Sequence, residues 1–218
     1  MSWRTTAAGN YLVRTASTPG ATPYTVCFRV QLVTDRNTTG TMVSLFNSNG
    51  SIYQDVRVTS SGTVPELRTN ANNSASSADL AVGTWYHVAY VRNGTSFTLY
   101  VDGASVGTLT SSISLTPAGF TIGSNSVSWV NARFQDAGIW SAALSQADVQ
   151  AEAASVGAAA RTADLWAYWP LASDANDTSG NARNLTVTGT ASWEAGLNVL
   201  GATGFAAGAP VLDSPTAG

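Results

Sequence analysis

The stretch GTWYHVAYVRNGTSFTLYVDG, residues 83–103, carries the clearest structural signal in the chain. From residue 85 to residue 91, odd-numbered side chains fall on one face of an extended strand and even-numbered ones on the other. Both faces are largely apolar, which predicts a central strand that is covered on both sides. Asn93-Gly94 and Asp102-Gly103 supply the positive φ angles of type I′ turns, so we expect three consecutive antiparallel strands from residue 85 to about residue 109.

The same period of two recurs between turn residues along the rest of the chain. It predicts strands at residues 24–33, 41–48, 52–58 and 132–140. Ser145 and Asp148 are spaced as a capping box, and good helix formers follow, so one short helix is expected over about residues 145–158. An aromatic strand, Leu165–Leu171, comes after the helix, and a final strand pair is expected near residues 185–194.

Length and composition favour one globular β domain. The chain has 218 residues, of which 44% are hydrophobic and only 11% charged, enough apolar surface for a core and too little charge to drive disorder. We expect a single domain over residues 1–194. Residues 195–218 are rich in Gly, Ala and Pro and almost uncharged, and we expect them to form an arm.

Several function classes are disfavoured. All ten basic residues are Arg, the net charge is −3 and no basic run exists. Binding to nucleic acid is therefore not expected, because it needs clustered basic side chains that neutralise the phosphates. No apolar run is long enough for membrane insertion, and the N-terminus lacks the apolar region of a signal peptide, so synthesis in the cytosol is expected. Cys27 is the only cysteine and lies in an apolar run, which predicts a buried small side chain.

Three motifs carry a family resemblance. They are Gly83–Ala89 with Leu99–Gly103, then Phe120–Gly123 with Phe134–Trp140 and Leu144–Val149, and finally Ala167–Leu171 with Asp177–Asn181. In these motifs the chain resembles the laminin-G-like jelly-roll superfamily of concanavalin A-like lectins and glucanases, which includes pentraxins. The resemblance implies an all-β, two-sheet antiparallel jelly-roll sandwich with one short helix. The third motif usually opens such domains, so here the first strand is supplied last; a truncated second copy is the alternative.

Catalysis is not expected. Glycosidases need two carboxyl groups that flank one glycosidic bond, and those on this type of fold place them on one strand. The three glutamates, Glu66, Glu152 and Glu194, are far apart in sequence. His87 is the only histidine and lies on an apolar strand face, which favours a buried structural residue over a catalytic base. We therefore predict that the protein is not an enzyme.

A sugar site is predicted from the aromatic residues, because their faces suit the C–H faces of pyranose rings. Trp85, Trp140 and Trp169 fall in strand motifs and are expected in the core. Trp129 differs, because it lies in a loop rich in Ser and Asn, between Asn125 and Asn131. These three residues are the predicted ligand-binding set, and Trp3 and Trp193 are the next candidates for exposed aromatics.

The loop at residues 173–179 offers oxygen ligands for a calcium ion, from Asp174, Asn176 and Asp177. The resemblance adds weight, because many relatives bind calcium at an edge of the sandwich. The alternative is a loop of Asx turns that satisfies its own backbone, and of the two interpretations this one is favoured. Calcium is the one cofactor that the sequence suggests.

Two functions remain, both non-catalytic. The first is a surface-displayed binding or structural module of a virion, such as a phage head decoration or a tail-associated protein, with a glycan-binding adhesion role. The alternative is a free-standing carbohydrate-binding module of a bacterial extracellular protein. The expected partners are a glycan, neighbouring subunits or further copies of the chain. Leu197, Leu200 and Phe205 are the apolar residues through which the arm is expected to assemble.

Overall fold

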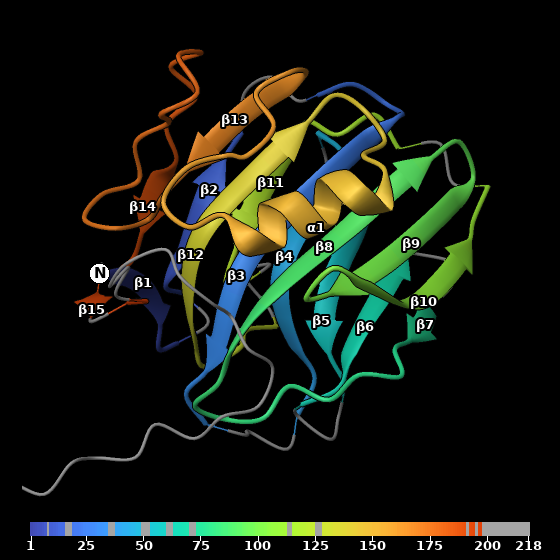
Figure 1. Ribbon diagram of the computed structural model, residues 1–218. Helices are drawn as coiled ribbons and strands as arrows, with labels where there is room; N and C mark the ends of the chain where they lie inside the picture. The colour runs from blue at the N-terminus through green and yellow to red at the C-terminus, as the bar shows by residue number, and fades with distance from the viewer. Residues whose placement is uncertain are drawn as a thin grey trace, which may run out of the picture.

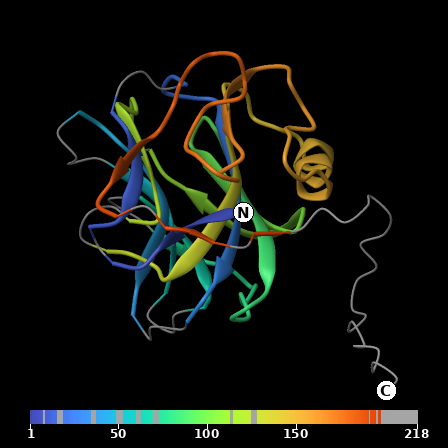
Figure 2. The ribbon, with the colours of Figure 1, turned by 90° about the vertical axis from the view of Figure 1, so that its left-hand side faces the viewer.

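The computed structural model describes residues 1–7, 9–15, 19–34, 38–48, 53–59, 63–69, 73–112, 115–124, 128–190, 192–194 and 196–197. These residues form two antiparallel sheets, stacked as a sandwich, and one helix that lies on the outside of one sheet (Figures 1 and 2). The predicted two-sheet jelly-roll class is confirmed.

Within the described residues, eight strands form the first sheet, sheet A. They are β1 (Ser2–Thr5), β3 (Tyr24–Leu32), β8 (Trp85–Asn93), β9 (Ser96–Val101), β10 (Ala104–Thr110), β12 (Ala132–Trp140), β13 (Leu165–Trp169) and β15 (Trp193–Glu194). Seven strands form sheet B. They are β2 (Tyr11–Arg14), β4 (Gly40–Phe46), β5 (Tyr53–Val58), β6 (Pro65–Thr69), β7 (Asn73–Ala75), β11 (Gly119–Ile122) and β14 (Thr186–Thr188).

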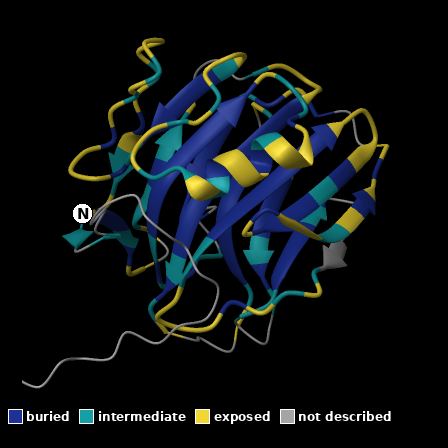
Figure 3. Cartoon of the chain, viewed as in Figure 1, coloured by how far each residue is buried: buried dark blue, intermediate teal, exposed yellow. Residues whose placement is uncertain are grey.

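From Val88 to Val91, strand β8 is covered on both faces, as its sequence predicts. Val88 and Tyr90 point into the core between the two sheets. Ala89 and Val91 point the other way, into a smaller core that helix α1 (Gln146–Ala154) closes with Val149. Figure 3 shows the strands beneath α1 as buried and the outer side of the helix as exposed. Sheet A is therefore the middle layer of the molecule.

The turns around β9 follow the predicted hairpins with one difference. Asp102 and Gly103 have φ angles of 48° and 77°, the two positive values of a type I′ turn. In the preceding hairpin, Asn93 pairs with Ser96, so Gly94, with φ 62°, is the first residue of a two-residue loop. A positive φ at the first loop residue is the type II′ pattern. The turn differs from the expected type I′ because Asn93 belongs to β8 and not to the loop.

Helix α1 begins as predicted and ends four residues early. The Ser145 side chain accepts a hydrogen bond from the Asp148 N–H, and the Asp148 carboxylate accepts one from the Ser145 N–H. Ser155 ends the helix in an extended conformation. Arg29, on β3, donates from NH2 to the Ser155 carbonyl at 2.5 Å, and this cation beneath the helix C-terminus complements the helix dipole.

The aromatic strand after the helix is integral to the fold. β13 pairs with β12, and the fully buried Trp169 ring stacks on Phe120 of sheet B, with ring centroids 5.5 Å apart. The Trp169 Nε1–H donates to the Arg183 carbonyl at 2.8 Å. The predicted final strand pair is wrong in its pairing, because β14 pairs with β2 in sheet B while β15 pairs with β1 in sheet A.

Replacing Trp169 with Ala is expected to lower the free energy of unfolding by about 3–5 kcal/mol, the usual cost of removing a fully buried aromatic ring. Urea denaturation at constant temperature measures this loss. Val82→Ala, at a side chain that is 45% exposed, is the control and is expected to change stability by under about 0.5 kcal/mol. If the two variants were equally stable, β13 would be an appendage rather than part of the core.

Candidate functional site

Four strands of sheet A bring polar and aromatic side chains into direct register on its outer face. Cross-strand pairing joins Arg4 on β1 to Arg133 on β12, Arg133 to Gln31 on β3, and Gln31 to Trp85 on β8. We call these four residues the Trp85 row. Adjacent strands are about 4.8 Å apart, so the row spans roughly 14 Å. An aromatic ring, an amide and two guanidinium groups thus form one line across the sheet.

The row is held in place by its own hydrogen bonds. Gln31 donates from Nε2 to the Gly83 carbonyl at 2.5 Å and accepts from Arg133 NH1 at 2.8 Å. Arg133 and Arg4 both bind Glu194 of β15, at 2.7 Å and 2.6 Å. Burial acts to raise the pKa of Glu194, but the hydrogen bonds from the two arginines outweigh it and lower the pKa, so this carboxylate stays ionised.

The row lies where α1 does not cover sheet A. Figure 1 shows the helix across the middle of β8 and β12, and the lower ends of both strands, where they begin, are not beneath it. The side chains of Arg4 and Arg133 are 24% and 28% exposed, and Gln31 and Trp85 are half-buried. Trp85 packs in neither hydrophobic core. The prediction that Trp85 is a core residue is therefore wrong, whereas Trp140 and Trp169 are fully buried as predicted.

The next cross-strand pair toward the helix, His87 and Arg29, is buried. His87 is 2% exposed beside Arg29, and burial, followed by the Arg29 charge, lowers the pKa of His87 to about 3. The imidazole is therefore neutral at physiological pH. Its Nδ1 has no hydrogen-bond partner among the described residues, while its backbone N–H donates to Asp102 at 2.8 Å. His87 is buried as predicted. Cys27 is also buried in this layer, as predicted, and burial raises the pKa of its thiol.

The outer face of sheet B is polar but ion-paired. Arg68 binds both carboxylate oxygens of Asp55, and Arg57 binds Glu66 at 2.6 Å. Asp55 is fully buried, and that burial raises its pKa against the opposing effect of Arg68. Two carboxylates on neighbouring strands of one face are a feature that the sequence reasoning missed. Each of these carboxylates is ion-paired with an arginine. This face therefore offers fewer accessible polar groups to a ligand than the Trp85 row does.

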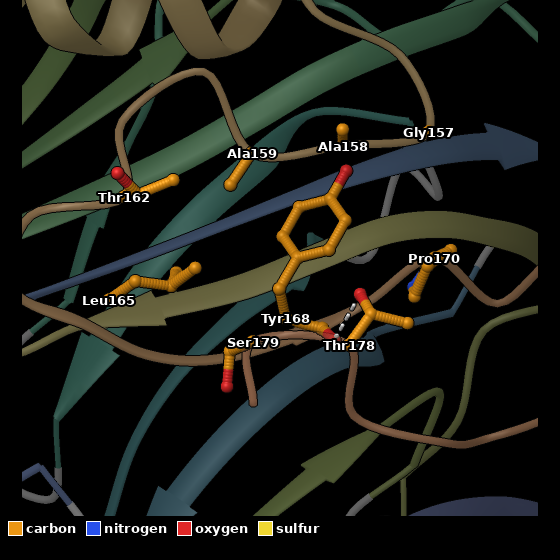
Figure 4. A pocket seen from close by; sticks show the side chains of 9 residues that line it. All are labelled: Gly157, Ala158, Ala159, Thr162, Leu165, Tyr168, Pro170, Thr178 and Ser179. Carbon is orange, nitrogen blue, oxygen red and sulfur yellow. Dashed lines mark hydrogen bonds between the residues drawn. The ribbon is translucent and has the colours of Figure 1, made fainter. Parts of the chain in front are cut away.

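A pocket of about 410 Å³ lies beside β13 (Figure 4). One wall is the segment from Gly157 to Thr162, and the other holds Pro170 and Thr178. Tyr168 lies between them, and Thr178 donates from Oγ1 to its carbonyl. None of the lining side chains is charged. The pocket can accept a small neutral group but provides no ionic contact.

The predicted Trp129 set is only partly described. Asn131 lies at the end of the Trp85 row, where its Oδ1 is 3.5 Å from Arg4 NH2 and its Nδ2 donates to Thr34 at 2.9 Å. Trp129 is half-buried and forms an isolated bridge with Ser124. Asn125 lies outside the described residues. Their role as ligand-binding residues stays a prediction.

The two further aromatic candidates differ from expectation. Trp3 is fully buried, because its ring packs against Phe134 in the core between the sheets. Its expected exposure is therefore wrong. Trp193 is half-buried and packs against the same core. Neither strand of this pair, β1 or β15, was predicted with its partner, which is why the inward direction of Trp3 was missed.

The loop that holds the candidate calcium ligands is organised by its own backbone. Asp177 accepts hydrogen bonds from the N–H groups of Tyr168, Ser179 and Arg183 at 2.8–3.0 Å. Asp174 accepts from the Asn176 N–H at 3.0 Å, an Asx turn. Burial acts to raise the pKa of Asp177, but these donors outweigh it and lower the pKa. Within the described residues, no three His, Cys, Asp or Glu side chains are grouped as metal ligands.

Of the predicted arm residues, only Leu197 is described. It is half-buried, and its N–H donates to Gln135 Oε1 at 3.0 Å. Leu200 and Phe205 lie outside the described residues. Helix α1 has nine residues. In the described part of the chain, no helix is long and apolar enough to cross a membrane.

Comparison with known proteins agrees with this fold. A family model described as the concanavalin A-like lectin/glucanases superfamily matches residues 5–150. No match is found among curated proteins. The native heptameric SAP-like pentraxin of Limulus polyphemus is similar in structure, with a TM-score of 0.55 and 23% identity over 70% of this chain and 80% of the pentraxin.

Two longer proteins are also similar in structure. A carbohydrate-binding protein of Bacteroides ovatus, so described provisionally, has a TM-score of 0.69 and 15% identity over 88% of this chain. Domains LG4-5 of the mouse laminin α1 chain have a TM-score of 0.52 and 12% identity over 65% of it. The chain covers 59% and 42% of these two proteins. At these identities the likeness shows a shared fold.

The Asx-turn geometry predicts that calcium leaves the protein unchanged, because an ion at Asp177 would have to displace three backbone donors. We expect the same Tm with excess calcium and with EDTA, measured by differential scanning calorimetry. Asp174→Asn keeps an oxygen that can accept from Asn176 and is expected to behave like the wild type. A rise in Tm with calcium that this variant lacks would establish an ion site instead.

Proposed function

Because the chain belongs to the concanavalin A-like lectin/glucanases superfamily, we propose that it is a non-catalytic carbohydrate-binding module that holds a glycan on the Trp85 row. One observation carries the proposal. The row combines a half-buried tryptophan with amide and guanidinium donors on four paired strands, away from both hydrophobic cores.

The chemistry of the row suits a sugar chain. The Trp85 ring offers an apolar face to the C–H groups of a pyranose, and Gln31 and Arg133 offer hydrogen bonds to its hydroxyls. Both polar side chains are already fixed by hydrogen bonds, so little side-chain entropy is lost when a glycan binds. The strands are central to a packed sandwich, which keeps the spacing of these groups constant.

The non-catalytic part of the proposal rests on the state of the carboxylates. Asp55 and Glu66 share the outer face of sheet B, but each is ion-paired with an arginine, and Asp55 is fully buried. A general acid or a nucleophile has to reach the glycosidic bond. Glu152 accepts hydrogen bonds from the N–H groups of Ala160 and Arg161, so it is also engaged in structure.

We further propose that the module is displayed on a virion, as a head decoration or tail-associated protein. The C-terminal segment would join it to neighbouring subunits. Its last described residues support this arrangement: Leu197 is bound to Gln135, and a side chain at Gly196 would collide with the Met1 carbonyl. The segment therefore leaves the domain from a fixed point beside β1 and β12.

Replacing Trp85 with Ala is expected to weaken glycan binding by about thirtyfold, since a buried tryptophan at the centre of a contact is worth about 2 kcal/mol. Binding is measured on a microarray of neutral and acidic polysaccharides and then by calorimetry on the best ligand. Gln150→Ala, at an exposed position on α1, is the matched control and should bind like the wild type.

Two results would contradict the proposal. Equal binding by Trp85→Ala and the wild type would move the site elsewhere on the molecule. Hydrolysis of any bound polysaccharide by the wild type, lost in a Glu66→Gln variant, would show an enzyme whose carboxylates act on the outer face of sheet B.

Deleting residues 198–218 is expected to preserve cooperative unfolding, because the strands and core residues that the structure describes lie within residues 1–194. The deletion is also expected to abolish self-association or particle binding. Light scattering after size-exclusion chromatography measures the association, and calorimetry measures the folding. The double variant Leu200→Ser, Phe205→Ser keeps the length of the segment and should show the same loss. If the deletion variant associates as well as the full chain, the display role is wrong and a free-standing carbohydrate-binding module becomes the better account.

A further inference from the structure

We propose that the glycan held on the Trp85 row is acidic, and that Arg133 binds the carboxylate of a uronic acid unit. This inference rests on the proposed function and names the ligand class of the same site. It follows from the charge balance of the row, from the donors that remain on Arg133, and from the order of the groups along the row.

The charges at one end of the row do not balance. Arg4 and Arg133 both bind Glu194, at 2.6 Å and 2.7 Å, so two positive groups share one negative group. One positive charge is therefore in excess among these residues. The ion pairs on the outer face of sheet B are different, because each arginine there has its own carboxylate: Arg57 has Glu66, and Arg68 has Asp55.

Arg133 retains donors that suit a carboxylate. A guanidinium carries five N–H groups. Nε and NH2 of Arg133 lie 2.8 Å and 2.7 Å from Glu194 Oε2, and NH1 donates to Gln31 at 2.8 Å. One N–H on NH1 and one on NH2 remain without a partner in the described part of the chain. Neighbouring N–H groups of this kind bind a carboxylate in the bidentate manner.

The order of the groups sets where the acidic unit lies. Trp85 and Arg133 are two strands apart, with Gln31 between them, which places them roughly 10 Å apart along the row. A chain with one pyranose stacked on Trp85 would then present a later unit to Arg133, and Gln31 would face the hydroxyls between them. The site therefore fits an oligosaccharide whose uronic acid lies at the Arg4 end and away from the tryptophan.

Arg133 already binds one carboxylate, that of Glu194, and its position is fixed. Glu194 belongs to β15, which pairs with β1, so its carboxylate stays beside the two arginines and cannot withdraw. An incoming carboxylate therefore adds to Glu194 and does not replace it. With two positive and two negative groups, the local net charge becomes zero, as it already is in each ion pair of sheet B.

The test compares one oligosaccharide in two forms. An oligogalacturonate carries a carboxylate on every unit, and its carboxyl-reduced form is the neutral galactose chain of the same linkage. Calorimetry at low ionic strength is expected to show at least tenfold tighter binding of the acidic form by the wild type, because charge-assisted hydrogen bonds are the stronger ones. Added salt should reduce this preference.

Three variants separate the contributions. Arg133→Gln should bring the preference for the acidic form close to one, and Arg133→Lys, which keeps the charge but not the planar fork, should keep only part of it. Trp85→Ala should weaken both forms by the same factor and leave the ratio unchanged. Arg57→Gln, on the other sheet, is the control and should keep the wild-type ratio. Calorimetric scans verify that each variant is folded.

The outcomes distinguish the inference from the proposed function. If the wild type binds both forms equally and Trp85→Ala weakens both, the row binds glycans but the acidic class is wrong. If it binds neither form while neutral polysaccharides bind on the array, the acidic class is also wrong. If no glycan of any kind binds, the proposed function itself fails. A preference that Arg133→Gln leaves intact would place the carboxylate at another residue.

Discussion

Sheet A has to bury two apolar faces, and most of the structure follows from this constraint. Sheet B covers one face with the large core that includes Val88, Tyr90 and Trp169. Helix α1 covers part of the other face through Val149 and the residues around it. A nine-residue helix is about 14 Å long, so it cannot cover a sheet of this width. The Trp85 row lies in the part of the face that the helix leaves open.

The position of the helix depends on a second interaction, buried between it and the sheet. Arg29 reaches the carbonyls at the helix C-terminus and lies 3.3 Å from the Asp136 carboxylate, which accepts from the Gly157 N–H. Burial raises the pKa of Asp136, against the lowering effect of Gly157 and Arg29. Removal of either partner would leave the other charge buried and unpaired, a change that commonly costs about 3–5 kcal/mol. The boundary between the covered and the open part of the face is thus fixed by one ion pair.

Local sequence patterns predicted the strands, turns and helix whose residues are close together in sequence. They did not predict the features that depend on pairing between strands distant in sequence. The β8–β9–β10 meander was predictable because its alternation and its Gly-containing turns lie within the 26 residues from Trp85 to Thr110. The capping box likewise located α1. β1 and β2 were missed because four-residue strands show too little alternation. Trp85 was assigned to the core because its neighbours are apolar, whereas its environment depends on where α1 ends. The row itself joins residues 4, 31, 85 and 133, and only the register of four strands reveals it.

The order of the strands has a consequence for how the protein forms during translation. β12 pairs with β1, β3 and β13, and the last three strands, β13 to β15, complete both sheets. While these late segments are still inside the ribosome, β1 and β2 each lack a neighbour, and Phe120 lacks the ring of Trp169 that stacks on it. Non-local pairing of this kind slows folding and exposes strand edges in the meantime. These strand edges and the Phe120 ring therefore stay uncovered until the chain up to Glu194 has emerged.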